Sequence, residues 1–220
     1  MKPTPTNAPW IMGGLPLLNV ASTFQPTRAL GPGLRAVVWL QGCNLNCSGC
    51  IAPEWIPRVI KRLVEPEKLA EELLIDPLVT GLTFSGGEPM LQAAGLAQLA
   101  RHARSQRNVS IICFTGLALE QLREHPPGPG VEELLAEVDV LIDGTYVASQ
   151  NDNLGLRGSS NQRVLYLTER FRGLDLEHNP RRAEIHVGDG YAVLVGVPPV
   201  GLEEALDQAI ASAKGSLSKG

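Results

Sequence analysis

The chain has 220 residues, of which 44% are hydrophobic and 19% charged, with a formal net charge of −4 at pH 7. This length and apolar content suffice for one domain with a full hydrophobic core. Its lysines and arginines are scattered and form no basic stripe, so nucleic acid is excluded as the primary partner. No apolar run is long enough to cross a bilayer and the N-terminus lacks the continuous apolar segment of a signal peptide, so we expect a cytoplasmic protein with no membrane partner.

Short apolar runs alternate with amphipathic stretches along the first 170 residues, after an N-terminus of about 15 residues that we expect to be irregular. Apolar and β-branched runs bounded by turn residues predict strands at 35–40, 79–84, 109–114, 138–143 and 162–167. Apolar residues at helical spacing predict helices at 65–76, 90–106 and 131–138. The first of these helices has Pro66 in its first turn and ends before Pro77, both common positions for proline.

Regular alternation of strands and helices implies parallel strands joined by right-handed crossovers. The chain has room for about five or six such strands, fewer than the eight of a closed barrel. We therefore expect an α/β fold, a partial (open) parallel βα barrel over residues 1–170, with its chemistry on the loops that follow the strands. The remainder, 171–220, is expected to pack on the same domain as a C-terminal extension. It has a hairpin at 183–197, turning at Gly188-Asp189-Gly190, and a helix that begins at Leu202.

Three of the four cysteines lie in one loop, "WLQGCNLNCSGC", at the spacing C-x3-C-x2-C. These residues, Cys43, Cys47 and Cys50, follow the carboxyl end of the first predicted strand, where a partial barrel has its active site. Three thiolates fit an iron–sulfur cubane with one iron left open for another ligand. A zinc site would need a fourth ligand, and the nearest histidine is the distant His102, while a disulfide would leave an odd thiol in a reducing compartment. The fourth cysteine, Cys113, lies in an apolar strand and is expected to be a core residue.

A second motif, "FSGGEPM", follows the next predicted strand and opens a helix, so it belongs to the same rim. Its glycines allow the backbone to approach a ligand closely, and the Glu88 carboxylate and backbone carbonyls can receive an ammonium group. Taken alone, the motif is also typical of a turn with proline at a helix start. The candidate residues of this turn are Ser85, Gly86, Gly87, Glu88 and Pro89.

Together, the two motifs resemble those of the radical S-adenosylmethionine (SAM) superfamily. More closely, the chain resembles the small activating proteins of anaerobic ribonucleotide reductase, in the segments "GPGLRAVVWLQGCNLNCSGC", "LTFSGGEPMLQ", "CFTGLALEQL", "DVLIDGTY" and "LRGSSNQRVLYL". The resemblance implies a [4Fe-4S] cluster on the three cysteines and SAM on its open iron and on the glycine turn. It implies reductive cleavage of SAM to a 5'-deoxyadenosyl radical, which takes a hydrogen atom from a glycine of a large glycyl-radical enzyme. The electron would come from reduced flavodoxin or ferredoxin.

The later segments supply further candidates for contact with the cofactor. Thr115 and Gly116 end the third strand and could contact the adenosyl group, although Thr-Gly is also an ordinary turn. Asp143 is expected to point into the barrel mouth or to be a turn carboxylate before Gly144. Arg157 lies in a polar loop that matches the family's segment and would bind the cofactor carboxylate or the partner's loop, unless it is only solvated.

Two alternatives remain open from the sequence. One is a radical SAM enzyme that acts on a small molecule or peptide, such as a 7-carboxy-7-deazaguanine synthase; Ile51, where such an enzyme would have a polar residue supporting magnesium, argues against this case. The other is a non-catalytic zinc or iron–sulfur module.

Overall fold

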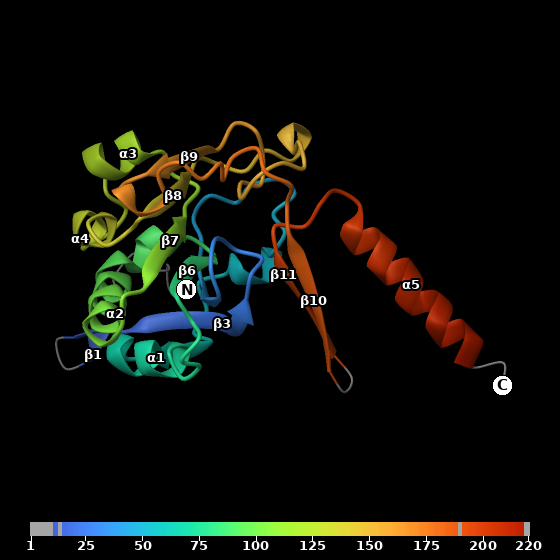
Figure 1. The fold of residues 1–220 in the computed structure, drawn as a ribbon, viewed down its shortest axis with the longest axis horizontal. Coiled ribbons are helices and arrows are strands. Elements are labelled where there is room, and N and C mark those ends of the chain that lie inside the picture. Colours follow the sequence, from blue (N-terminus) through green and yellow to red (C-terminus); the bar gives the residue numbers. More distant parts are fainter. Residues whose placement is uncertain (1–10, 13–14, 189–190, 218–220) are drawn as a thin grey trace, which may run out of the picture.

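A seven-stranded mixed sheet forms the centre of the molecule, in a computed structural model that describes residues 11–12, 15–188 and 191–217. Its strand order is β5-β3-β4-β6-β7-β8-β9, and the four strands β4, β6, β7 and β8 are parallel (Figure 1). The strands span Leu18–Thr27 (β3), Arg35–Leu40 (β4), Arg62–Val64 (β5), Gly81–Gly86 (β6), Ser110–Phe114 (β7), Val140–Asp143 (β8) and Arg163–Tyr166 (β9). The α/β class and the parallel centre of the sheet, both predicted from the sequence, are confirmed.

The strands at the two edges of this sheet differ from the regular alternation of parallel strands and helices that the sequence predicts. Strand β9 was expected to continue the parallel order, and this was wrong, because β9 pairs antiparallel with β8. On the other side, β3 and β5 are antiparallel additions that the sequence patterns did not indicate. Ahead of them, the short strands β1 (Ile11–Met12) and β2 (Leu15–Pro16) pair with each other, so part of the N-terminus expected to be irregular has regular structure.

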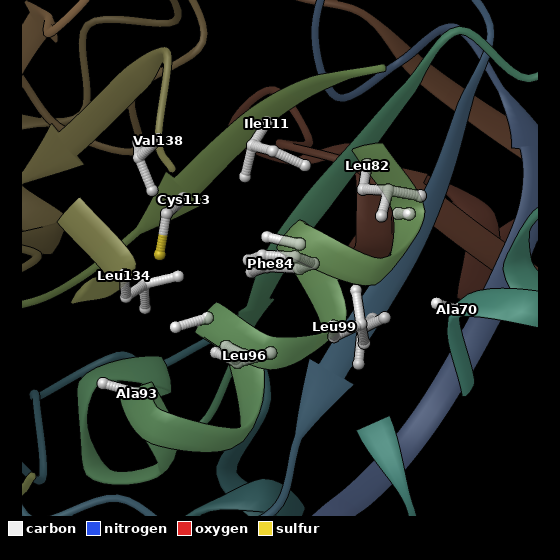
Figure 2. Packing of buried hydrophobic residues seen from close by; sticks show 14 of the residues in the cluster. Ala70, Leu82, Phe84, Ala93, Leu96, Leu99, Ile111, Cys113, Leu134 and Val138 are labelled. Carbon is white, nitrogen blue, oxygen red and sulfur yellow. The ribbon is translucent and has the colours of Figure 1, made fainter. Parts of the chain in front are cut away.

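Helices cover one face of the sheet, and the largest hydrophobic cluster lies between them and the strands (Figure 2). The helices are α1 (Pro66–Leu73), α2 (Ala93–Gln106), α3 (Leu119–Glu124) and α4 (Val131–Leu135). Leu96, Leu99 and Ala103 of α2 are fully buried, as the helical spacing predicts. Cys113 is also fully buried in this cluster, which confirms that it is a core residue. Helix α1 begins at Pro66, where a missing N–H costs no hydrogen bond.

The C-terminal extension follows β9 in the chain and includes a hairpin of β10 (Ala183–Gly188) and β11 (Tyr191–Gly196). The hairpin is confirmed, although Asp189 and Gly190 of its turn lie outside the described residues. Val195 of β11 is fully buried in a cluster with Leu30, Val37 and Trp39, so the hairpin covers the sheet face opposite the helices.

Helix α5 (Leu202–Leu217) follows the hairpin and lies apart from the sheet (Figure 1). Most of the side chains described in its first half are exposed. Among the described residues, no helix is both long and apolar enough to span a membrane.

Candidate metal and cofactor site

The three clustered cysteines lie on the loop that leaves the carboxyl end of β4. Cys43, Cys47 and Cys50 are all half-buried free thiols. The loop doubles back on itself, because the Gly42 N–H donates to the Trp55 carbonyl at 2.8 Å and the Cys43 N–H to the Ile56 carbonyl at 3.0 Å. The chain on both sides of the cysteines is therefore fixed.

The glycine turn after β6 is bonded directly to this cysteine loop. The Gly87 N–H donates to the Leu40 carbonyl at 2.8 Å, and the Glu88 N–H donates to the Gly42 carbonyl at 2.9 Å. A Cβ atom at Gly87 would lie 2.2 Å from the Gly42 oxygen, a separation that real side chains do not reach. The sequence predicted close backbone approach here, and in the structure the group approached is the cysteine loop itself.

Further contacts extend the loop over the ends of the next two strands. A Cβ atom at Gly116, after β7, would lie 2.2 Å from Cδ1 of Leu45. After β8, Ala148 lies 3.1 Å and Cε1 of Tyr146 4.0 Å from the Cβ position of Gly49. The cysteine loop thus lies across the carboxyl ends of all four parallel strands, which is the rim where α/β sheets bind their ligands.

Glu88 is buried beneath this rim instead of facing it. Its carboxylate is 1% exposed and accepts hydrogen bonds from the Met90 N–H, the Thr115 hydroxyl and the Gly116 N–H at 2.8 to 2.9 Å. Burial raises the pKa of Glu88, while these three hydrogen bonds act in the opposite direction. In this structure the Glu88 carboxylate joins the glycine turn to the end of β7, and so does Thr115, which is 4% exposed.

Asp143 and Arg157 also have partners within the protein. Asp143 is fully buried, accepts from the Leu119 N–H at 2.7 Å and is paired with Arg163, so it does not point into an open mouth. Arg157 is 6% exposed and pairs with Asp152 at 2.9 Å and Glu177 at 2.5 Å. Of the candidate cofactor-binding residues, Ser85, Gly86 and Gly87 are half-buried at the rim, whereas Pro89 is buried where the short helix Pro89–Gln92 begins.

The thiols are held in a partly desolvated environment. Burial raises the pKa of Cys43 and of Cys47, because a thiolate is less stable away from water. The Leu45 N–H, 3.4 Å from the Cys43 sulfur, opposes this by stabilising the thiolate. Binding of a metal here would therefore release protons from the cysteines.

The arrangement of donor atoms bears on which metal fits. Among the described residues, no three His, Cys, Asp or Glu side chains converge closely enough to hold one metal ion. A tetrahedral zinc needs its ligands around a single point. A [4Fe-4S] cubane with one open iron takes three thiolates, and the three free thiols of this loop match that donor set.

Several residues of this region were not singled out by the sequence analysis. They are Asn19 and Gln41, which bond to the segment that follows the cysteines, Gln92, which bonds to Gln41, and Tyr146 and Ala148, which follow β8 and contact the loop. The sequence feature that could have indicated Asn19 and Gln41 is their position at the ends of apolar runs, because an amide side chain buried there needs hydrogen-bond partners.

Comparison with known proteins gives a consistent picture. Residues 29–165 match the family model of the 4Fe-4S single cluster domain. The chain is 30% identical over 142 residues to the anaerobic ribonucleoside-triphosphate reductase-activating protein of Vibrio cholerae, a match that covers 60% of this chain and 87% of that protein. It is 40% identical over 81 residues to the pyruvate formate-lyase-activating enzyme of Clostridium pasteurianum, covering 34% of each chain. The crystal structure of QueE from Escherichia coli aligns with 46% of this chain and 53% of that chain at a TM-score of 0.40 and 17% identity, a level that does not establish a common fold.

Proposed function

Because the chain belongs to the 4Fe-4S single cluster domain family and is related to anaerobic ribonucleoside-triphosphate reductase-activating proteins, we propose that it is a radical SAM enzyme that activates a glycyl-radical enzyme. The relatives supply the class of reaction. The observation that carries the proposal for this chain is the loop of three free thiols packed over the ends of four parallel strands and bonded to the glycine turn.

The chain's residues would divide the work as follows. Cys43, Cys47 and Cys50 would hold a [4Fe-4S] cluster through their thiolates. Ser85 and the backbone of Gly86 and Gly87, half-buried beside that loop, would receive the polar end of SAM. A cluster held by these cysteines would supply the one electron needed for reductive cleavage of SAM, with methionine as the leaving group, and so the chemistry for hydrogen abstraction from a glycine of the partner. We further propose that the sheet acts as an open βα barrel of the radical SAM type.

The partner and the setting follow from the same proposal. A large glycyl-radical enzyme, such as an anaerobic ribonucleotide reductase, would present its glycine at the cysteine rim. A low-potential donor, reduced flavodoxin or ferredoxin, would supply the electron. We propose a cytoplasmic setting, where clustered thiols remain reduced and available for iron.

Anaerobic reconstitution with iron and sulfide, followed by reduction in the presence of SAM, tests this function. The expected result is a reduced-cluster electron-paramagnetic resonance (EPR) signal and formation of 5'-deoxyadenosine that requires the reductant. Cys47→Ala should abolish both, whereas Cys113→Ala, which changes a buried core residue, should keep both. A protein that retains an intact cluster but forms no 5'-deoxyadenosine under strong reduction would contradict the proposal.

A further inference from the structure

The segment that follows the cysteines has little hydrophobic burial beyond Trp55, which is partly buried and stacks on Trp39 at a centroid distance of 5.4 Å. We define the return arm as residues 54–61, the stretch that brings the chain back along the start of the cysteine loop. Its residues Val59 and Ile60 are 49% and 58% exposed, and Pro57 and Lys61 are exposed as well. Apolar packing therefore does little to fix the arm from residue 57 onward.

Asn19 of β3 holds the outer half of the arm through its buried side chain. This residue is 1% exposed, its Nδ2 donates to the Val59 carbonyl at 2.9 Å and its Oδ1 accepts from the Lys61 N–H at 2.9 Å. A single amide thus binds two backbone groups of the arm, which lie 40 and 42 positions further along the chain.

Gln41, directly before the cysteine loop, holds the inner half. It is 2% exposed, and its Nε2 donates to the Pro57 carbonyl at 2.6 Å and to the Glu54 carbonyl at 3.2 Å. Its Oε1 is buried without a hydrogen-bond partner among the described residues. Burying an acceptor without a partner costs free energy. The two hydrogen bonds from Nε2 to the arm are therefore what stabilises this side chain in its buried position.

Gln92, at the end of the short helix after the glycine turn, links the other two residues. Its Oε1 accepts from the Asn19 N–H at 2.7 Å, and its Nε2 donates to the carbonyls of Asn19 at 3.2 Å and Gln41 at 3.1 Å. The three amides therefore connect β3, the end of β4 and the glycine turn to the return arm.

We propose that Asn19, Gln41 and Gln92 form an amide clamp that positions the cluster cysteines before iron binds. The clamp fixes the return arm, and the arm fixes the loop, because the carbonyls of Trp55 and Ile56 accept from Gly42 and Cys43. These three are positioning residues, since they act through the arm and through Cys43. This inference rests on the proposed function only for the identity of the group that the cysteines hold.

The test compares Asn19→Leu and Gln92→Leu with Gln25→Leu. The control glutamine lies on the same strand β3 and likewise donates from Nε2 to a backbone carbonyl, that of Glu72 at 2.7 Å, but at the other end of the strand. Hydrogen–deuterium exchange is measured on the metal-free proteins at a temperature where each is folded by circular dichroism. The amides of Gly42 and Cys43 should exchange about tenfold faster in the two clamp variants and at the wild-type rate in the control.

The same proteins are then reconstituted anaerobically, and bound iron and the EPR spectrum of the reduced cluster are measured. The clamp variants should bind less than half the wild-type iron or give a broadened EPR signal, and Gln25→Leu should match the wild type. The clamp would be overturned if the clamp variants exchanged at the wild-type rate, or if they exchanged faster but bound as much iron as the wild type and gave its EPR spectrum. An effect of Gln25→Leu equal to that of the clamp variants would also overturn it. Should Gln92→Leu fail to fold, Gln92→Glu, which keeps the acceptor for Asn19 and loses both donors, gives the same comparison.

Failure of the clamp and failure of the proposed function are separable. Exchange is measured without iron, so it decides the clamp even if the wild-type protein assembles no cluster. Conversely, a wild-type protein that cleaves SAM while its clamp variants exchange normally would retain the function and lose the clamp.

Discussion

Gly87→Ala should be the most informative single substitution at the rim, because it adds one methyl group where the two motifs touch. The new Cβ would lie 2.2 Å from the oxygen and 2.8 Å from the carbon of the Gly42 carbonyl. Backbone atoms cannot move away as the end of a flexible side chain can. The glycine turn and the cysteine loop must therefore separate by about 1 Å to reach an ordinary contact distance.

That separation has a calculable cost. A shift of about 1 Å takes the Glu88 N–H beyond hydrogen-bonding distance of the Gly42 carbonyl, now 2.9 Å away, and weakens the 2.8 Å bond from Gly87 to Leu40. Each lost bond between poorly hydrated groups costs about 1–3 kcal/mol. We expect a total loss of about 2–4 kcal/mol in the free energy of unfolding, or a Tm lower by about 5–15 °C for a chain of this length.

Thermal unfolding of the metal-free protein measures this cost, and anaerobic reconstitution measures its effect on iron binding. Gly128→Ala is the matched control, because the nearest atoms to its Cβ position are 3.6 Å away and should accommodate a methyl group. Gly87→Ala should lower both Tm and bound iron, while Gly128→Ala should change neither. A Gly87→Ala protein with wild-type Tm and iron content would refute the close packing of the two motifs.

Three further outcomes are expected. Alanine at Cys43, Cys47 or Cys50 should remove the cluster's absorbance, whereas Cys113→Ala should keep it and only lower the free energy of unfolding, by the few kcal/mol that a core truncation costs. Burial raises the pKa of Glu88 above its usual 4.5, so the stability that this group contributes is full in acid and is lost as pH rises through the raised pKa. The free energy of unfolding of the metal-free protein should therefore fall from about pH 4.5 upward, and more steeply in the wild type than in Glu88→Gln. Arg35→Met should destabilise the fold by about 2–4 kcal/mol in a denaturant titration, because the buried hydroxyl oxygens of Thr83 and Ser110 would lose the guanidinium that donates to them.

Local patterns were sufficient to predict the parallel core of the sheet. Strand β4 begins and ends at the predicted residues, because "RAVVWL" is buried on both faces and such strands are apolar throughout. The predicted helix at 65–76 ends three residues early, at Leu73, since the following Leu74 already leaves helical geometry. The cysteine and glycine motifs meet because parallel strands bring their carboxyl ends to one edge, a consequence of topology that spacing alone implies.

The antiparallel strands at the two edges of the sheet could not be predicted from local sequence patterns. Strand β3 mixes apolar and polar residues without regular alternation, "NVASTFQPT", and its pairing to β4 has bulges, so no alternating pattern indicates it. Strand β9 has the same apolar character as its parallel neighbours, and nothing in "RVLY" encodes the direction of pairing. Strand direction depends on the connection before it, which here contains no crossover helix but only the short helix Ala148–Gln150.

The hydrogen-bond and ion-pair partners of the charged candidate residues could not be predicted from the sequence either, and they change which groups are available to a ligand. Glu88, Asp143 and Arg157 are the charged candidates at the rim, and each already has its hydrogen bonds or ion pairs within the protein. Moving any of them toward a ligand would break several bonds and leave a buried charge or buried donors unpaired, at a cost of about 3–5 kcal/mol. The half-buried groups that remain at the rim are the thiols, Ser85, Gly86 and Gly87, of which the Gly87 N–H already donates to the Leu40 carbonyl. A ligand of this site would therefore be recognised by thiolates and backbone, while the charged residues hold the strand ends in register beneath it.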